Sequence, residues 1–234
     1  MKIYRKSYRI SLCIGISLLI AIAVCFNYGA YLPVAGNMIA EKKLTQYSNR
    51  LIPYHQKVKT VYDWYNSRYV TNDREGNMLA YRLKSNTIYD EAVSIQINLG
   101  ARAQFEKAKQ VLSPDLEFAS DIHIWTEINA DDYSVKRQRL YLLGIYSSQY
   151  VSEEESRKMP AAIARQVIEL MGDDYNFTGI QLIYYDRNGG YTIEIPSGTF
   201  EPLKYEDMLE NTRKMEKEEV GETYFHWLEQ NKDL

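Results

Sequence analysis

One uncharged stretch near the N-terminus constrains this chain more than any other feature. No charged residue occurs from Ile10 to Ala40. Four cations come directly before this stretch: Lys2, Arg5, Lys6 and Arg9. A helix from Ile10 to Tyr31 would be about 30 Å long, which is one hydrocarbon thickness. Because positive residues favour the cytoplasmic side, the sequence predicts a single-pass anchor in the cell membrane. Its N-terminus is cytoplasmic, and the domain after Tyr31 is extracytoplasmic.

Two alternatives to an uncleaved anchor use the same stretch. A signal peptide cleaved at Val34-Ala35-Gly36 would need an apolar region of about 7–15 residues, and the region here is longer. A lipoprotein would use Cys25, but the preceding Ile22-Ala23-Val24 has a branched residue where Gly, Ala or Ser is expected. We therefore expect a signal-anchor that is retained, and cleavage stays the open alternative.

Composition limits the partners of the remaining residues. Both cysteines, Cys13 and Cys25, lie in the apolar stretch, so the ectodomain has no disulfide. An exported domain without disulfides favours a bacterium with a single membrane as the source of the protein. Without the four leading cations, 24 basic residues face 31 acidic ones, a balance of about −7. Phosphate binding needs a basic face, so nucleic acid and anionic lipid are disfavoured as partners.

Hydrophobic periodicity predicts pairs of strands that alternate with helices. Helices are expected at 40–52, 91–112, 152–171 and 204–217. Strands are expected at 58–66, 78–83, 121–128, 139–146, 180–185 and 191–195. Ser152 and Glu155 have the spacing of a capping box at the start of the third helix. Strand pairs joined by short loops indicate an α+β fold, in which helices cover antiparallel strands on one face.

The predicted domain organisation has four parts. They are a cytoplasmic stub with the anchor (1–36), an N-terminal α+β module (37–115), a C-terminal α+β module (116–220) and an aromatic tail (221–234). Tyr62 and Tyr69 recur as Tyr184 and Tyr191 at the same offset, which favours two related modules. The apolar residues of the tail, Tyr224–Leu228, are expected to pack on the sheet.

Several short motifs resemble the YfjL-like membrane-anchored proteins of Firmicutes. They are Ala35-Gly36-Asn37, Lys42-Lys43-Leu44 followed by Tyr47, the Val58–Asn66 strand, Ile88-Tyr89-Asp90-Glu91, and the block from Phe177 to Tyr191. Met38 stands where such proteins often have proline. The resemblance implies a membrane-anchored layout with two α+β modules. The family is uncharacterised, so the resemblance implies no catalytic residues.

Two groups of residues are candidates for binding. His123 and Trp125 share one side of a predicted strand with Asp121 and Glu127, where a flanked imidazole could bind a metal or transfer a proton. A solvent-facing polar strand explains this group equally and is the more common case. Tyr62, Trp64 and Asn66 share one side of the first predicted hairpin, where aromatic rings could stack on a ligand.

No stretch matches a known catalytic, metal or cofactor motif. The histidines have no zinc-ligand spacing, and Ser197 is outside a nucleophile elbow. We expect no catalytic residues, no metal and no cofactor. The leading hypothesis is a non-enzymatic binding or regulatory module at the cell surface, with the membrane and a second membrane or surface protein as partners. The alternatives are a bitopic subunit of a membrane assembly and an enzyme acting on cell-wall or peptide substrates.

Overall fold

The computed structural model describes residues 12–22, 33–51, 57–197 and 202–230. Of the predicted anchor Ile10 to Tyr31, residues 12–22 are helical and exposed, and the rest lies outside the described residues. Among the described residues, no helix has both the length and the apolar character needed to cross a membrane.

The protein divides into two compact units. Unit 1 comprises Met1–Asp90 and the short segment Asn129–Tyr133, and unit 2 comprises Glu91–Ile128 and Ser134–Leu234. This division differs from the predicted boundary between residues 115 and 116. The helix that starts at Glu91 belongs to unit 2 because its apolar face, including Ala101 and Phe105, is part of the unit 2 core. Both units contain helices and strands, so the fold is α+β.

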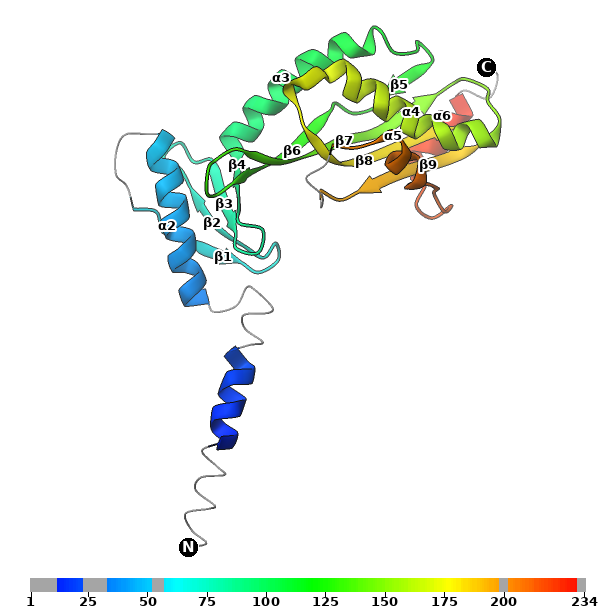
Figure 1. The fold of residues 1–234 in the computed structure, drawn as a ribbon. Coiled ribbons are helices and arrows are strands. Elements are labelled where there is room, and N and C mark those ends of the chain that lie inside the picture. The colour runs from blue at the N-terminus through cyan, green and yellow to red at the C-terminus, as the bar shows by residue number, and fades with distance from the viewer. Residues whose placement is uncertain (1–11, 23–32, 52–56, 198–201, 231–234) are drawn as a thin grey trace, which may run out of the picture. The chain divides into compact units, whose positions relative to one another are not determined.

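In the described residues from Pro33 to Asp90, unit 1 packs a helix on a small antiparallel sheet (Figure 1). Its elements are α2 (Pro33–Leu51), β1 (Val61–Asp63), β2 (Arg68–Asn72), β3 (Met78–Arg82) and β4 (Thr87–Asp90). The strands pair in sequence order. The helix begins earlier than predicted because Pro33 suits the first helical position. Of the predicted strand 58–66, only Val61–Asp63 is a strand; residues 58–60 are not in a strand, and a turn follows Asp63.

The core of unit 1 is built from tyrosines as much as from aliphatic residues. Ala40, Leu44 and Tyr47 form the buried stripe of α2, at the helical spacing expected from the sequence. From the sheet, Tyr69 and Tyr81 are buried and are cross-strand neighbours.

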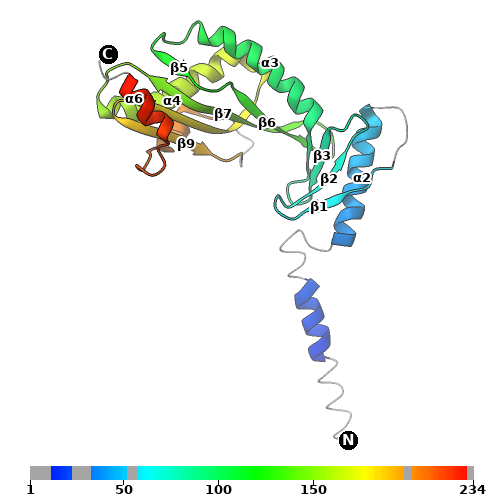
Figure 2. The ribbon, with the colours of Figure 1, turned by 180° about the vertical axis from the view of Figure 1, so that it is seen from behind.

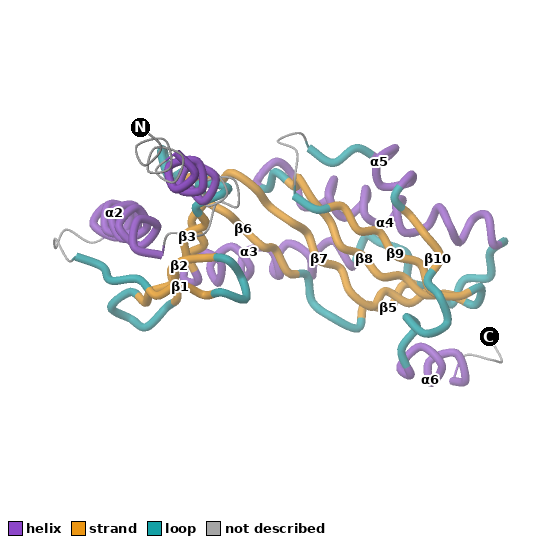
Figure 3. The backbone as a smooth tube through the Cα atoms, turned by 90° about the horizontal axis from the view of Figure 1, so that it is seen from below, coloured by secondary structure: helices purple, strands orange, loops and turns teal. Residues whose placement is uncertain are grey.

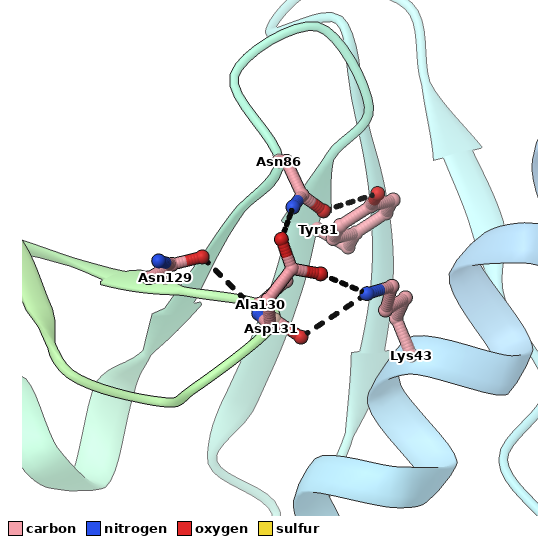
Figure 4. Close-up of polar contacts among 6 residues, drawn as sticks. All are labelled: Lys43, Tyr81, Asn86, Asn129, Ala130 and Asp131. Atoms are coloured by element: carbon pink, nitrogen blue, oxygen red, sulfur yellow. Dashed lines mark hydrogen bonds and ion pairs between the residues drawn. The ribbon is translucent and has the colours of Figure 1, made fainter.

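A turn from the second half of the chain completes unit 1 (Figure 4). The Asp131 carboxylate receives hydrogen bonds from Nζ of Lys43 at 2.5 Å and from Nδ2 of Asn86 at 2.7 Å. The backbone N–H of Ala130 also donates to the carbonyl of Asn86. The hydroxyl of Tyr81 donates to Oδ1 of Asn86 at 3.0 Å. The sequence predicts a turn at 129–132 but gives no sign that it belongs with α2 and β4.

Unit 2 has a larger sheet in which β7 is the longest strand. Its strands are β5 (Leu116–Phe118), β6 (His123–Asn129), β7 (Val135–Ser147), β8 (Phe177–Asp186), β9 (Gly189–Ile195) and β10 (Thr212–Lys214). Both β5 and β6 pair with β7, at different ends of that strand, and β8, β9 and β10 follow in order. Only the pairing of β7 with β8 is parallel among these described pairs.

Helices cover the two faces of this sheet unequally. They are α3 (Glu91–Lys109), α4 (Glu153–Met171), α5 (Tyr205–Glu210) and α6 (Glu222–Gln230), with a short 3-10 turn at Gly172–Asp174. The main core lies under α3 and α4, around Phe105, Val167 and Ile180. Figure 2 shows α6 in front of the strands and α4 behind them, and Figure 3 shows the same elements from below. One end of the second face is covered by α6, together with Met215 and Val220 from the segment before it.

Several local predictions for unit 2 are confirmed. Ser152 and Glu155 form both bonds of the capping box, and α4 runs to Met171. The hairpin β8–β9 is present, with Tyr184 directly opposite Tyr191. In β1–β2, Tyr62 is directly opposite Tyr69, so the two repeated tyrosine pairs occupy equivalent cross-strand positions.

Two predictions near the C-terminus have different outcomes. The predicted helix 204–217 is wrong after Glu210, because Thr212–Lys214 pairs with β9 as an edge strand instead. The predicted packing of the tail on the sheet is confirmed. Tyr224 and Trp227 of α6 are buried in a cluster with Tyr146 and Tyr185.

Candidate binding surfaces

The first predicted group lies at the end of the β1–β2 hairpin in unit 1. Tyr62 is in β1, whereas Trp64 and Asn66 are in the four-residue turn that follows. The ring of Tyr62 contacts both Trp64 and Tyr69, at 4.8 Å between centroids in each case. The structure therefore brings Tyr62 and Trp64 together, but it gives Asn66 a different role.

Asp63 organises this turn. Its carboxylate accepts hydrogen bonds from the backbone N–H of Asn66 at 3.2 Å and from the Asn66 side chain at 2.8 Å. Nε of Arg68 forms an ion pair with the same carboxylate at 3.1 Å. The bonds from Asn66, with a smaller contribution from Arg68, lower the pKa of Asp63 to about 2. Asn66 thus fixes the shape of the turn rather than offering a free binding group.

The turn holds two large aromatic side chains in solvent. Trp64 is 69% exposed and the adjacent Tyr65 is 95% exposed, and Val61 beside them is 75% exposed. Sequence reasoning identified Trp64 but missed Tyr65, because both were expected in a strand where one of them would be covered. The turn residues 64–67 carry no charge.

The second predicted group lies on the face of the unit 2 sheet opposite α3 and α4. Ile124 in β6 and Ile122 directly before the strand are completely buried in the core on the helix side, so His123 and Trp125 point to the other face, as the alternation predicts. Trp125 is half-buried and His123 is exposed. The desolvation of the imidazole, with a further contribution from Arg102, lowers the pKa of His123. Both effects favour the neutral form of the imidazole.

Neighbouring strands extend this face in register. His123 is opposite Tyr141, Tyr141 is opposite Gln181, and Gln181 is opposite Glu194. We call this set, with Trp125 and Arg139, the open-face row. The guanidinium of Arg139 stacks on Tyr141 at 5.1 Å from the ring centroid. It also forms an ion pair with Glu194 at 3.3 Å. Sequence reasoning missed these partners because strand 139–146 was read as continuously apolar.

The carboxylates expected beside His123 have partners elsewhere. Asp121 is 3.8 Å from Nε of Arg102, and buried Glu127 is 3.9 Å from Arg137. Within the described ranges, no group of three or more His, Cys, Asp or Glu side chains is arranged to hold a metal ion. The geometry around His123 therefore suits stacking and hydrogen bonding.

A depression of about 520 Å³ lies elsewhere in unit 2, between α4 and the edge strand β10. Its lining residues are Glu153, Glu154, Arg157, Tyr191, Thr212, Arg213 and Lys214. Lys214 forms an ion pair with Glu153, and Arg213 contacts both carboxylate oxygens of Glu219 at 2.7 Å. Most of its charges are thus neutralised by neighbours. It includes neither His123 nor Trp125, and sequence reasoning missed it because β10 was expected to be helical.

The two predicted groups lie in different units, Tyr62 and Trp64 in unit 1 and His123 and Trp125 in unit 2. Comparison of the chain with models of protein families finds no match. Searches of the curated proteins and of the solved structures also find no match. What these surfaces bind must therefore follow from their own chemistry.

Proposed function

We propose that this protein is a membrane-anchored, extracytoplasmic binding or regulatory module without catalytic activity of its own. The open-face row of unit 2 is its proposed binding surface. The same proposal includes a retained N-terminal anchor, an N-terminus in the cytoplasm, and the two α+β units as related modules outside the membrane.

The location is supported by the sequence of the N-terminal segment. The uncharged run from Ile10 to Ala40 follows four cations, and both cysteines are inside it. The resemblance to the YfjL-like proteins of Firmicutes supports the same layout. The relatedness of the units is supported by the two tyrosine pairs, Tyr62 with Tyr69 and Tyr184 with Tyr191, which are cross-strand partners in both hairpins.

One observation carries the proposed binding role. On the face opposite α3 and α4, Arg139 is held between the ring of Tyr141 and the carboxylate of Glu194, next to Trp125 and His123. The guanidinium is already oriented, so a ligand that stacks on it or accepts its hydrogen bonds meets little ordering cost. The His123 ring also lies 5.7 Å from Tyr141, which adds a second flat surface.

The chemistry of the row favours a peptide or protein partner. The aromatic rings of the row can stack on a ligand, the guanidinium of Arg139 can donate hydrogen bonds, and the carboxylate of Glu194 can accept them. Aromatic residues and arginine are enriched in the same way at protein–protein interfaces. His123 and Glu194 are exposed, the other residues of the row are partly buried, and the charges of Arg139 and Glu194 balance. Such a surface suits a partner with both polar and apolar groups and gives no advantage to a polyanion.

Site-specific photocrosslinking in cells tests this proposal. A photoreactive residue at Gln181, in the middle of the row, is expected to give discrete adducts with the anchored protein. These adducts should be lost when Arg139→Ala and Tyr141→Ala are combined with it. The matched control is the same residue at Glu169, which is exposed on the outer side of α4. Equal adducts at both positions, or none at Gln181, would overturn the binding role.

The His123→Ala variant addresses the enzymatic alternative. If the row is a binding surface, His123→Ala removes only one of its several rings. We then expect a partial loss of the crosslinked adducts and a partial loss of the cellular phenotype. A complete loss of phenotype with adducts unchanged would instead indicate catalysis at His123 and contradict the proposal.

A further inference from the structure

We propose that Trp64 and Tyr65 insert into the headgroup region of the membrane that holds the N-terminal anchor. The turn of β1–β2 would then be a second, reversible membrane contact of unit 1. This inference rests on the anchoring part of the proposed function, and the experiment below separates the two.

Contacts inside unit 1 place this turn at the N-terminal end of α2. The N–H of Val58 donates to Oγ1 of Thr45 at 3.1 Å. Two residues later, Thr60 contacts Glu41 through its N–H and Asn37 through its hydroxyl, at 3.4 and 3.5 Å. The chain entering β1 therefore runs antiparallel to α2, towards the first turns of the helix.

The return strand of the hairpin meets the same end of the helix. A Cβ placed on Gly36 would lie only 1.7 Å from the hydroxyl of Tyr69, so this ring packs directly on the backbone of the helix. Tyr69 is opposite Tyr62, and the turn residues lie beyond this pair. Both strands of the hairpin thus place Trp64 and Tyr65 at the end of unit 1 where α2 begins.

The lengths of β1 and of the start of α2 show how far the turn itself reaches. From Thr60, which contacts Asn37, three more strand residues to Asp63 cover about 10 Å. The four helical residues from Asn37 back to Pro33 cover only about 6 Å. The turn therefore reaches about as far as the first residue of α2, or slightly further.

The predicted span brings that end of unit 1 to the bilayer. It ends at Tyr31, two residues before Pro33, and two residues span at most about 7 Å of extended chain. If the span crosses the membrane, the start of α2 lies within the headgroup region. The turn that is level with it reaches the same region.

The turn has the chemistry of an interfacial contact. Trp and Tyr are the residues that concentrate at membrane interfaces, because a flat apolar ring carries one polar group. Here they are adjacent, and both are largely exposed. Asp63 and Arg68 flank the turn in sequence and neutralise each other as an ion pair, which lowers the cost of bringing the turn into the headgroup region. The bonds of Asp63 to Asn66 fix the turn in advance, which lowers the entropy cost of insertion.

Fluorescence in lipid nanodiscs tests the inference with the full-length protein. The protein contains three tryptophans, so the emission of Trp64 is obtained as the difference between wild type and Trp64→Phe. In phosphatidylcholine nanodiscs brominated near the headgroups, we expect this difference signal to fall by about twofold or more. Bromine near the bilayer centre should quench it less. A Trp64 signal that is unquenched by either lipid and open to aqueous iodide would overturn the inference.

Two controls keep the outcomes separate. Alkaline extraction of the protein from vesicles reports the anchor alone: release of wild type refutes the anchor and, with it, this inference. If the wild-type protein stays in the vesicles but the fluorescence of Trp64 is not quenched, only the membrane contact of the turn is refuted. Tyr65→Ser should reduce quenching of Trp64, whereas Tyr150→Ser, at an exposed site in unit 2, should not. Unchanged quenching in Tyr65→Ser would contradict the paired insertion proposed here.

Discussion

The hydroxyl of Tyr47 in α2 donates a 2.8 Å hydrogen bond to Oδ2 of Asp90, the last residue of β4. Both side chains are buried, with 4% of each exposed. The bond joins α2 to β4, the fourth strand of unit 1. It also gives a polar partner to a carboxylate that has little access to water. Unit 1 thus depends on a buried polar contact as well as on its apolar stripe.

Removal of this hydroxyl is expected to destabilise unit 1. In Tyr47→Phe the ring is retained, but Oδ2 of Asp90 loses a donor in a buried site. We expect a loss of about 1–3 kcal/mol in the free energy of unfolding. Chemical denaturation measures it, and Tyr150→Phe is the control because Tyr150 is 83% exposed. Equal stability of Tyr47→Phe and the control would show that the bond contributes nothing.

Alkaline pH is expected to destabilise the protein through buried tyrosines. Burial, followed by the charge of Asp90, raises the pKa of Tyr47 above its usual value. Burial likewise raises the pKa of Tyr184. Above about pH 10 the unfolded chain releases these protons while the folded protein keeps them. The unfolded state then binds fewer protons, so stability falls as pH rises.

Thermal unfolding from pH 8 to 11 measures this dependence. The melting temperature should be constant until about pH 10 and should then fall. In Tyr47→Phe the decline should be shallower, because one of the shifted groups is absent. A decline of the same steepness in this variant would show that Tyr47 titrates normally.

Gly36 is expected to tolerate no side chain. Its Cβ position lies 1.7 Å from the hydroxyl oxygen of Tyr69 and 2.5 Å from the ring carbon that carries it. Gly36→Ala must therefore push α2 away from β2, which we expect to cost about 1–3 kcal/mol or more. Denaturation of Gly221→Ala is the comparison, because nothing lies within 4 Å of that Cβ position. Similar stability of the two variants would contradict the close packing.

The ion pair between Lys43 and Asp131 is expected to contribute little. Asp131 is 63% exposed, so water and salt screen the attraction. A double-mutant cycle with Lys43→Ala and Asp131→Ala should give a coupling energy below about 1 kcal/mol, smaller still at high salt. A larger, salt-independent value would mean that the hydrogen bond from Asn86 to the same carboxylate depends on Lys43.

Prediction from sequence succeeds here where a single local pattern is sufficient. Ser152 and Glu155 satisfy each other within one turn of helix, so their spacing alone defines the start of α4. The turn after Asp186 is similarly local, because Gly189 adopts a positive φ of 134° that favours glycine. The packing of the tail was predicted on a different basis, because a cluster of aromatic residues needs a surface to cover it, and Tyr146 and Tyr185 supply that surface.

Prediction fails where a distant partner decides the conformation. Thr212–Lys214 has helical residues before it, but pairing with β9 makes it a strand. The sequence predicts two strands in unit 1, at 58–66 and 78–83, and misses β2 and β4. The bonds of Asp63 to Asn66 end the first strand early, and β2 then pairs with both β1 and β3. Of the candidate residues, the alternation placed His123 and Trp125 correctly on one face. Their partner Arg139 became visible only when β7 was paired with β6.

The sequence by itself determined the helical periodicity of α2 and α4, the β8–β9 hairpin and the α+β class, because each depends on contacts between residues close in the chain. It also supplies the uncharged run Ile10–Tyr31, on which the proposed anchor rests. Only the tertiary structure decided that residues 129–133 belong with α2 and β4, and that Glu91 begins the second unit. The same holds for the exposure of Trp64 and Tyr65 in the turn between β1 and β2. These relationships join residues far apart in sequence, and their energy comes from packing and hydrogen bonds that no local pattern encodes.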